Sequence, residues 1–315
     1  EAFAGSGWFL RRARELAARA SALASETGNP ADRAWALMAL CTVHGLAGEF
    51  AESAAVGREA EAVYLRECKG VDWELMIVRT YLNGSLALLG EVAELVERVP
   101  AGLEDAERRG HRLAAVVHRA GQPSTAWLWL DQPEVILDAA GPPATEGVPF
   151  SALEYFHLLG TTQARLYTGD RDGARAALEA AWPGVKAGGF LSFPYCSSEM
   201  ALLRARVAAA CGDVATCRAQ AKAIANATNL RHAPAFSALA QALSGGIGPA
   251  AAPGYRAAAI ACAAAGLRLY AAACTWRAER CEGHADAAAA QAELARSLGV
   301  VAPERYFGSL VPAGS

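Results

Sequence analysis

The sequence lacks the features that mark a membrane protein or a nucleic-acid-binding protein. Lysine occurs only at Lys69, Lys186 and Lys222, and the net charge of −3 provides no basic surface for a polyanion. The longest apolar run, residues 257–267, is too short to span a bilayer. No signal peptide is visible, because the basic pair at 11–12 follows the N-terminal apolar patch. We therefore predict a cytoplasmic protein without nucleic-acid or membrane partners. The first residue, Glu1, leaves open whether the chain is a fragment of a longer protein.

Motifs for catalysis are also missing. The sequence contains no GxxxxGK[ST] loop, no HRD or DFG triplet and no GxSxG motif. No cluster of nucleophile, base and orienting residue is visible either. The prediction is therefore a noncatalytic protein that needs no cofactor.

The cysteines and histidines do not form a metal-binding pattern. The eight cysteines lack a framework spacing, and most lie in apolar helical patterns, where a free thiol behaves as a small hydrophobe. Cys41 and His44 form a CxxH pair, but a structural zinc site needs four ligands, so we expect Cys41 to pack in a core. His111 and His118 share one helical face without a carboxylate at HExxH spacing. No metal site is predicted, and the histidine face is interpreted as partly exposed and polar.

A repeated pattern of apolar helix, glycine turn and second helix is what the sequence does contain. Glycines of this kind stand at Gly48, Gly90, Gly169, Gly212 and Gly283. They recur at about 40 residues or at about twice that spacing, the range of helix-pair solenoids. The two long gaps predict additional turns near residues 130 and 247, where the segments WLDQPE and GGIGP occur.

Residues at fixed offsets from each glycine support this phasing. Seven before and five after it, the side chains are mostly small, as at Cys41, Ser53, Ala174 and Ala205. Small residues on both helices allow two antiparallel helices to approach closely. The tetratricopeptide repeat (TPR) has this pattern, although the period here is mostly longer and Trp276 interrupts the small-residue position.

The predicted fold is therefore all-α, a TPR-like right-handed solenoid of helical hairpins with about seven degenerate repeats. No strand pattern competes, because Pro194 interrupts the one short apolar candidate. We expect an irregular segment at about 141–149 to separate repeats at 1–140 from repeats and a cap at 150–315, with the two parts continuous. The tail from Pro303 to Ser315 should pack as a cap and then fray.

Three segments in the middle of the chain carry a resemblance to a known family. They read WLWLDQPEVILDAA (127–140), YFHLLGTTQARLYTGDRDGARAALEAAWP (155–183) and SSEMALLRARVAAACGD (197–213). This region resembles the C-terminal helical repeats of large bacterial serine/threonine protein kinases that also carry a STAND-type or AAA-type ATPase. The closing PERYFGSLVPA (303–313) is similar to their terminal motif. The resemblance implies a sensor or protein-interaction module, one that controls attached kinase or ATPase domains.

The first helix of each hairpin lines the concave face in a solenoid of this type. Positions thirteen and six before each glycine are seven apart and therefore share one face. We predict a groove for a peptide or partner domain at Trp35, Thr42, Phe156, Gln163, Glu199, Arg206, Tyr270 and Arg277, with Tyr167 beside them. A solvated inner surface with an incidental Glu199–Arg206 ion pair is the alternative.

Aromatic residues in the middle of the chain support a second hypothesis. They are Trp127, Trp129, Trp182, Phe190, Phe193 and Tyr195. Packing between stacked helices accounts for most of them, but Phe190 to Tyr195 lies between helices and is the better candidate for stacking on a ligand. In this hypothesis the chain is the inducer-sensing superhelix of a STAND-type regulator, and its partner is a small molecule.

Overall fold

The structure is a computed structural model that describes residues 7–139, 150–227 and 229–314. Across these three ranges every regular element is a helix, which confirms the all-α class. No helix in the described ranges is both long and apolar enough to cross a membrane. The loop predicted at 141–149 lies outside the described residues. We call residues 7–139 the first half and residues 150–314 the second half.

The helices follow one another along the chain with short connections. The first half contains α1 (Gly7–Thr27), α2 (Pro30–Ala47), α3 (Phe50–Glu67), α4 (Asp72–Leu89), α5 (Val92–Arg108), α6 (Arg112–Ala120), the 3-10 turn η2 (Gln122–Ser124), α7 (Thr125–Trp129) and α8 (Glu134–Leu137). The second half contains α9 (Ala152–Thr168), α10 (Arg171–Ala187), η3 (Phe190–Ser192), α11 (Pro194–Ala210), α12 (Val214–Ala225), α13 (Ala233–Leu243), η4 (Pro249–Ala251), α14 (Ala252–Ala264), α15 (Arg268–Glu282), α16 (Ala285–Ser297) and α17 (Pro303–Leu310).

The predicted turns are present. Gly48, Gly90, Gly169 and Gly283 cap α2, α4, α9 and α15 in the left-handed conformation, which glycine adopts without steric cost. The turn predicted near 130 follows α7 and contains Asp131 at φ 57°. The turn predicted near 247 separates α13 from η4.

One hydrogen bond recurs at the same repeat offsets in two hairpins. The Ser53 hydroxyl donates to the carbonyl of Cys41 at 2.9 Å, and the Cys217 thiol donates to the carbonyl of Ala205 at 3.4 Å. All four residues are fully buried. The small side chains thus lie where the two helices of a hairpin are in contact, as their spacing predicted.

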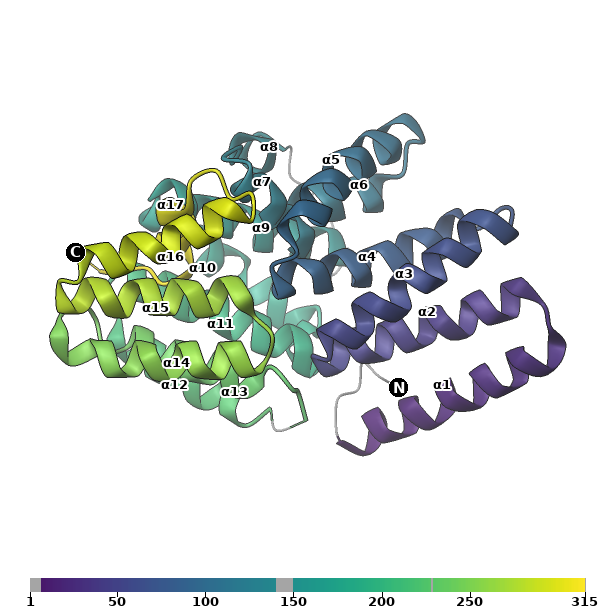
Figure 1. Ribbon diagram of the computed structural model, residues 1–315, viewed down its shortest axis with the longest axis horizontal. Helices are drawn as coiled ribbons and strands as arrows, with labels where there is room; N and C mark the ends of the chain where they lie inside the picture. The colour runs from purple at the N-terminus through teal and green to yellow at the C-terminus, as the bar shows by residue number, and fades with distance from the viewer. Residues whose placement is uncertain (1–6, 140–149, 228, 315) are drawn as a thin grey trace.

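The two halves lie against each other in Figure 1, and we call the line of hydrogen bonds that joins them the seam. The amide of Arg231 donates to the carbonyl of Ala47 at 2.9 Å, and the amide of Val301 donates to the carbonyl of Trp129 at 2.8 Å. Between them, the guanidinium of Arg268 donates to the carbonyls of Leu89 and Gly90, both at 3.1 Å. The last carbonyls of a helix have no partner within it, so the second half completes the ends of α2, α4 and α7.

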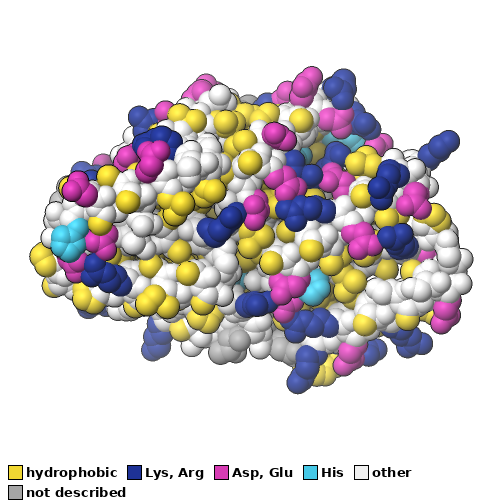
Figure 2. All heavy atoms as spheres, viewed as in Figure 1, with side chains coloured by type: hydrophobic (Ala, Val, Ile, Leu, Met, Phe, Trp, Pro, Cys, Tyr) yellow, Lys and Arg dark blue, Asp and Glu magenta, His cyan; other side chains and the backbone are white. Residues whose placement is uncertain are grey.

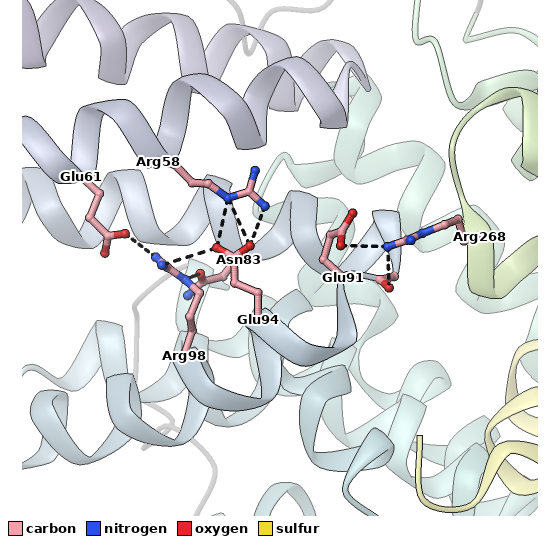
Figure 3. A network of polar contacts seen from close by, with 8 residues as sticks. Arg58, Glu61, Asn83, Glu91, Glu94, Arg98 and Arg268 are labelled. Carbon is pink, nitrogen blue, oxygen red and sulfur yellow. Dashed lines mark hydrogen bonds and ion pairs between the residues drawn. The ribbon is translucent and has the colours of Figure 1, made fainter. Parts of the chain in front are cut away.

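Ion pairs surround the central contact of the seam, as Figure 3 shows. Arg268 also pairs with Glu91 at 2.9 Å. Farther into the first half, Arg98 contacts Glu61 at 2.6 Å and Asn83 at 2.8 Å. Burial alone would raise the pKa of Glu61, but Arg98 and Arg79 lower it below its usual value. Elsewhere on the face in Figure 2, charges of both signs alternate with apolar side chains, in keeping with the small net charge.

The tail closes the array. Tyr306 and Phe307 of α17 are buried in the largest hydrophobic cluster, which spans both halves. Val311 is buried as well, and its carbonyl accepts two hydrogen bonds from Arg277, so the tail packs against the array as far as this residue.

Gly48 has a second constraint besides its φ of 78°. A Cβ built on it would lie 2.2 Å from Nδ1 of His232, which packs against the turn from the second half. His232 is itself held, since its Nε2 lies 3.0 Å from the Ser198 hydroxyl and its ring packs against Phe50 and Phe236. The close approach of the halves therefore requires glycine at residue 48.

We predict that Gly48→Ala destabilises the protein much more than Gly169→Ala. Both glycines have φ near 80°, but a Cβ at Gly169 meets nothing within 4 Å. Gly169→Ala should cost only the left-handed strain, about 1 kcal/mol, and Gly48→Ala should add an overpacking cost of about 2 kcal/mol. Urea denaturation of both variants measures the difference. Equal losses of unfolding free energy would show that the seam does not constrain this turn.

Candidate functional site

Part of the predicted concave face lies inside the molecule. Glu199, Arg206 and Tyr270 are only 9%, 3% and 8% exposed. They are covered because the seam brings α15 against α4, and because α17 packs against α9 within the second half, so the array folds over its own inner face. The expectation of an open groove at these three residues is therefore wrong.

Four of the predicted residues nevertheless meet at one place. Gln163, Glu199, Arg206 and Tyr270 line a central cavity of about 30 Å³. Nε of Arg206 donates to the carbonyl of Ser309 at 3.1 Å, and another guanidinium nitrogen lies 3.5 Å from the Gln163 side-chain oxygen. A space of this size suits a single water molecule and not a peptide.

Four of the remaining predicted groove residues do not share a site with these. Trp35 is 48% exposed and stacks on Trp73, with 6.1 Å between the ring centroids. Thr42 is half-buried on α2. The hydroxyl of Tyr167, which is buried, donates to Asp131 at 2.7 Å. Arg277 holds the tail through Val311, as described above, so Tyr167 and Arg277 support the fold.

A larger cavity of about 400 Å³ lies between the two halves, and we call it the aromatic pocket. From the first half it is lined by Gly45, Leu46, Phe50, Thr80, Tyr81, Gly84, Ser85, Val117, Gln122 and Pro123. From the second half it is lined by Ala152, Tyr155, Phe156, Phe190, Phe193, Tyr195, Cys196 and Glu199. Concave, largely apolar cavities with a few polar groups are the usual form of small-molecule sites.

Local sequence signals place the aromatic side chains of the second half. Ser151 and Glu154 form a capping box that starts α9, so Tyr155 and Phe156 lie in its first turns. Gly188 caps the end of α10, and Gly189, at φ 76°, leads into η3 with Phe190. The ring of Tyr155 stacks on Phe190 with centroids 4.8 Å apart and an interplanar angle of 13°.

Two tyrosine hydroxyls hold the polar groups of the aromatic pocket. Tyr155 donates to Oε2 of Glu199 at 2.5 Å, and Tyr195 donates to the side-chain oxygen of Gln122. Burial raises the pKa of Glu199 to about 7, although the Tyr155 hydrogen bond offsets part of this effect. Burial, together with the nearby Glu199 carboxylate, raises the pKa of both tyrosines well above the usual value. Glu199 is thus the lining group that changes charge near neutral pH.

The sequence identified part of this pocket. Phe156, Phe190, Phe193 and Tyr195 were candidates and line it. Trp127 and Trp129 are buried in the core instead, and Trp182 lies beneath the Arg204 guanidinium at 4.1 Å. The wall that the first half contributes was not predicted, because its residues come next to those of the second half only when the seam forms. Tyr155 could have been found as the neighbour of Phe156 in the capped first turn of its helix.

The two predicted histidines line a separate charged cavity of about 360 Å³ among α3, α4, α5 and α6. His111 is half-buried and His118 is buried, so the expected polar face is only partly open. Burial and the nearby Arg79 and Arg98 lower the pKa of His118 to about 4. This cavity holds acidic and basic groups together, including Glu61, and so carries no strong preference for a charged ligand.

Cys41 packs in the core as predicted, fully buried beside Ser53. Its partner in the CxxH pattern, His44, instead bonds to Glu49 at 2.7 Å. All eight thiols are free.

The described residues contain one group of three side chains close enough to share a metal ion, at Glu279, Glu282 and His284. The guanidinium of Arg256 contacts Glu279 at 2.9 Å and Glu282 at 2.6 Å. Hydrogen bonds from Arg256 lower the pKa of both carboxyls. A cationic side chain already neutralises the group, which lies at the surface.

Comparisons with protein-family models, with curated proteins and with solved structures find no match to this chain. The resemblance to kinase-associated and STAND-associated repeats stays a prediction. A function must therefore be inferred from the cavities and their chemistry.

We predict that Glu199→Gln gains stability relative to the wild type as pH rises. In the folded state the carboxyl of Glu199 has a pKa of about 7, whereas its ordinary value is 4.5. Between these two pH values the folded wild type holds a proton that the unfolded chain has released, so its stability falls as pH rises. Glutamine has no such loss. The stability difference between variant and wild type should grow by about 3 kcal/mol between pH 4.5 and pH 8.

Chemical denaturation of both proteins across this range tests the prediction. His118 and His232, whose pKa values burial lowers to about 4 and about 3, contribute stability that rises with pH over the acidic range. Their contribution is the same in both proteins and cancels in the difference. A difference that is constant with pH would contradict the assignment of Glu199 as a group titrating near neutrality.

Proposed function

We propose that this chain is a noncatalytic sensor that binds an apolar, ring-containing small molecule in the aromatic pocket. The observation that carries the proposal is the pocket itself. It encloses about 400 Å³ between the halves, and seven aromatic side chains contribute to its wall: Phe50, Tyr81, Tyr155, Phe156, Phe190, Phe193 and Tyr195. Aromatic rings provide large apolar contact areas and prefer stacked or edge-on neighbours, which another ring supplies.

A small molecule fits the structure better than the peptide groove that we also considered. The peptide hypothesis relied on Glu199, Arg206 and Tyr270, which are buried. The central cavity beside them, at about 30 Å³, is far smaller than a peptide side chain requires. The volume of the aromatic pocket falls within the usual range for small-molecule sites.

The position of the pocket suggests how binding becomes a signal. A ligand touching both Tyr81 of α4 and Phe190 of η3 would stabilise the closed arrangement of the two halves over any opened one. A ligand shifts a conformational equilibrium only through such a difference in affinity. In this proposal the array is a degenerate TPR-like solenoid closed on itself, and its output is an attached kinase or ATPase domain. The recurring hydrogen bonds at Ser53 and Cys217 support the repeat assignment.

We predict that the neutral fluorescent probe N-phenyl-1-naphthylamine binds to the aromatic pocket. Gly84→Phe should then weaken binding at least about tenfold, because the new ring occupies the cavity. Gly84 lines the pocket, and a Cβ there meets only the Gln122 side-chain oxygen, at 3.4 Å, so the substitution is compatible with the fold. Titration of the probe, followed by its emission, measures the affinity.

The matched control is Gly308→Phe, a glycine-to-phenylalanine change in α17 where a Cβ meets nothing within 4 Å. It should leave the probe affinity unchanged. Equal affinities for the wild type and Gly84→Phe would contradict the proposed function, as would the absence of probe binding to the wild type.

A further inference from the structure

We infer that the ligand of the aromatic pocket carries a protonated amine that binds to the carboxyl group of Glu199. This inference rests on the proposed function and specifies the chemical class of its ligand. It is carried by an unpaired oxygen atom, by the charges of the lining residues and by the aromatic surroundings.

Only one of the two carboxyl oxygens of Glu199 has a hydrogen-bond partner. Oε2 accepts the hydrogen bond from Tyr155, whereas Oε1 is buried and has no protein partner. The side chain belongs to the walls of both the aromatic pocket and the central cavity. A buried acceptor without a donor is costly, and more so when it is ionised. A ligand N–H group in the pocket would supply that donor.

No residue that lines the pocket offers a positive charge to compensate the negative charge of the Glu199 carboxylate. Among its described lining residues Glu199 is the one acidic side chain, and no arginine, lysine or histidine accompanies it. Of the two arginines on α11, Arg204 is five residues from Glu199 and its guanidinium lies over Trp182, whereas Arg206 is two helical turns away. Arg206 is directed to Ser309 and Gln163 by its own hydrogen bonds. The pocket is therefore complementary to a cation and opposed to an anion.

The surrounding rings favour the same ligand. A cation is attracted to the face of an aromatic ring, and more strongly where water is excluded. Tyr155 and Phe190 form a stacked pair, and Phe156 packs edge-on against Tyr155 with centroids 5.9 Å apart. An amine attached to an apolar ring would combine an ion pair at Glu199 with aromatic contacts.

Binding should depend on pH through Glu199. The titratable groups that interact with it are Tyr155 on α9, Tyr195 and Cys196 on α11, and Tyr270 on α15, and Arg206 of α11 lines the central cavity beside it. Burial raises the pKa of Cys196 to about 12 and raises those of the three tyrosines as well. Only Glu199 among them changes its charge between pH 5.5 and pH 8, so a cation should bind more weakly at the lower pH.

The test uses three molecules that share one scaffold and differ in charge: 2-phenylethylamine, 2-phenylethanol and 3-phenylpropionate. Each displaces N-phenyl-1-naphthylamine from the full chain at pH 8. We expect the amine to bind at least about tenfold more tightly than the alcohol, the usual gain for a hydrogen bond to a charged group. The carboxylate should bind at least about tenfold more weakly than the alcohol.

Glu199→Gln provides the decisive comparison, because its amide oxygen can still accept the Tyr155 hydrogen bond. In this variant the advantage of the amine should disappear while the alcohol binds as before. The amine should also lose affinity in the wild type at pH 5.5.

Equal affinities of amine and alcohol for the wild type would overturn the amine inference without contradicting the proposed function of the pocket. An amine preference that survives Glu199→Gln would overturn it as well. Failure of the proposed function is a different result, namely probe binding that Gly84→Phe does not weaken.

Discussion

The ends of three helices in the first half depend on partners from the second half. The terminal carbonyls of α2, α4 and α7 accept hydrogen bonds from Arg231, Arg268 and Val301, residues that lie far away along the chain. A helix end buried without such partners would be costly. The guanidinium of Arg268 adds a positive charge where the dipole of α4 is negative. The turns of the first half are thus completed by the starts of α13, α15 and α17, and this requirement fixes how the array closes.

Closure has two consequences for the inner face. It covers the side chains that an open solenoid would offer to a partner, so that Arg206 is buried and donates to the protein itself. It also leaves a space where the walls fail to meet, between α4 on one side and α9 and α11 on the other. Glu199 lies beside that space with a raised pKa and an unpaired oxygen, a destabilising arrangement that the surrounding packing maintains. Strained or unpaired groups of this kind concentrate at functional sites.

Local chemistry made much of this fold predictable. Gly48, Gly90 and Gly169 could be recognised as turns because only glycine takes the left-handed conformation freely, and the small residues that pack in each hairpin followed from them. The seam could not be predicted, because it joins residues such as Ala47 and Arg231 that no local pattern relates. For the same reason the sequence identified Phe190 to Tyr195 as a candidate site but not the wall formed by Phe50 and Tyr81. Burial of Glu199 and Arg206 likewise depends on closure, so helical periodicity alone predicted a groove at these residues, with a solvated ion pair as the alternative.

The central claim is that a ligand in the aromatic pocket tightens the seam. Amide hydrogen exchange at Arg231 measures it most directly, because this N–H donates to Ala47 across the seam. With saturating 2-phenylethylamine, exchange should be slower at Arg231 and at Val301 and unchanged in the middle of α12. Protection confined to the pocket residues around Phe190, with exchange at Arg231 and Val301 unaffected, would contradict it.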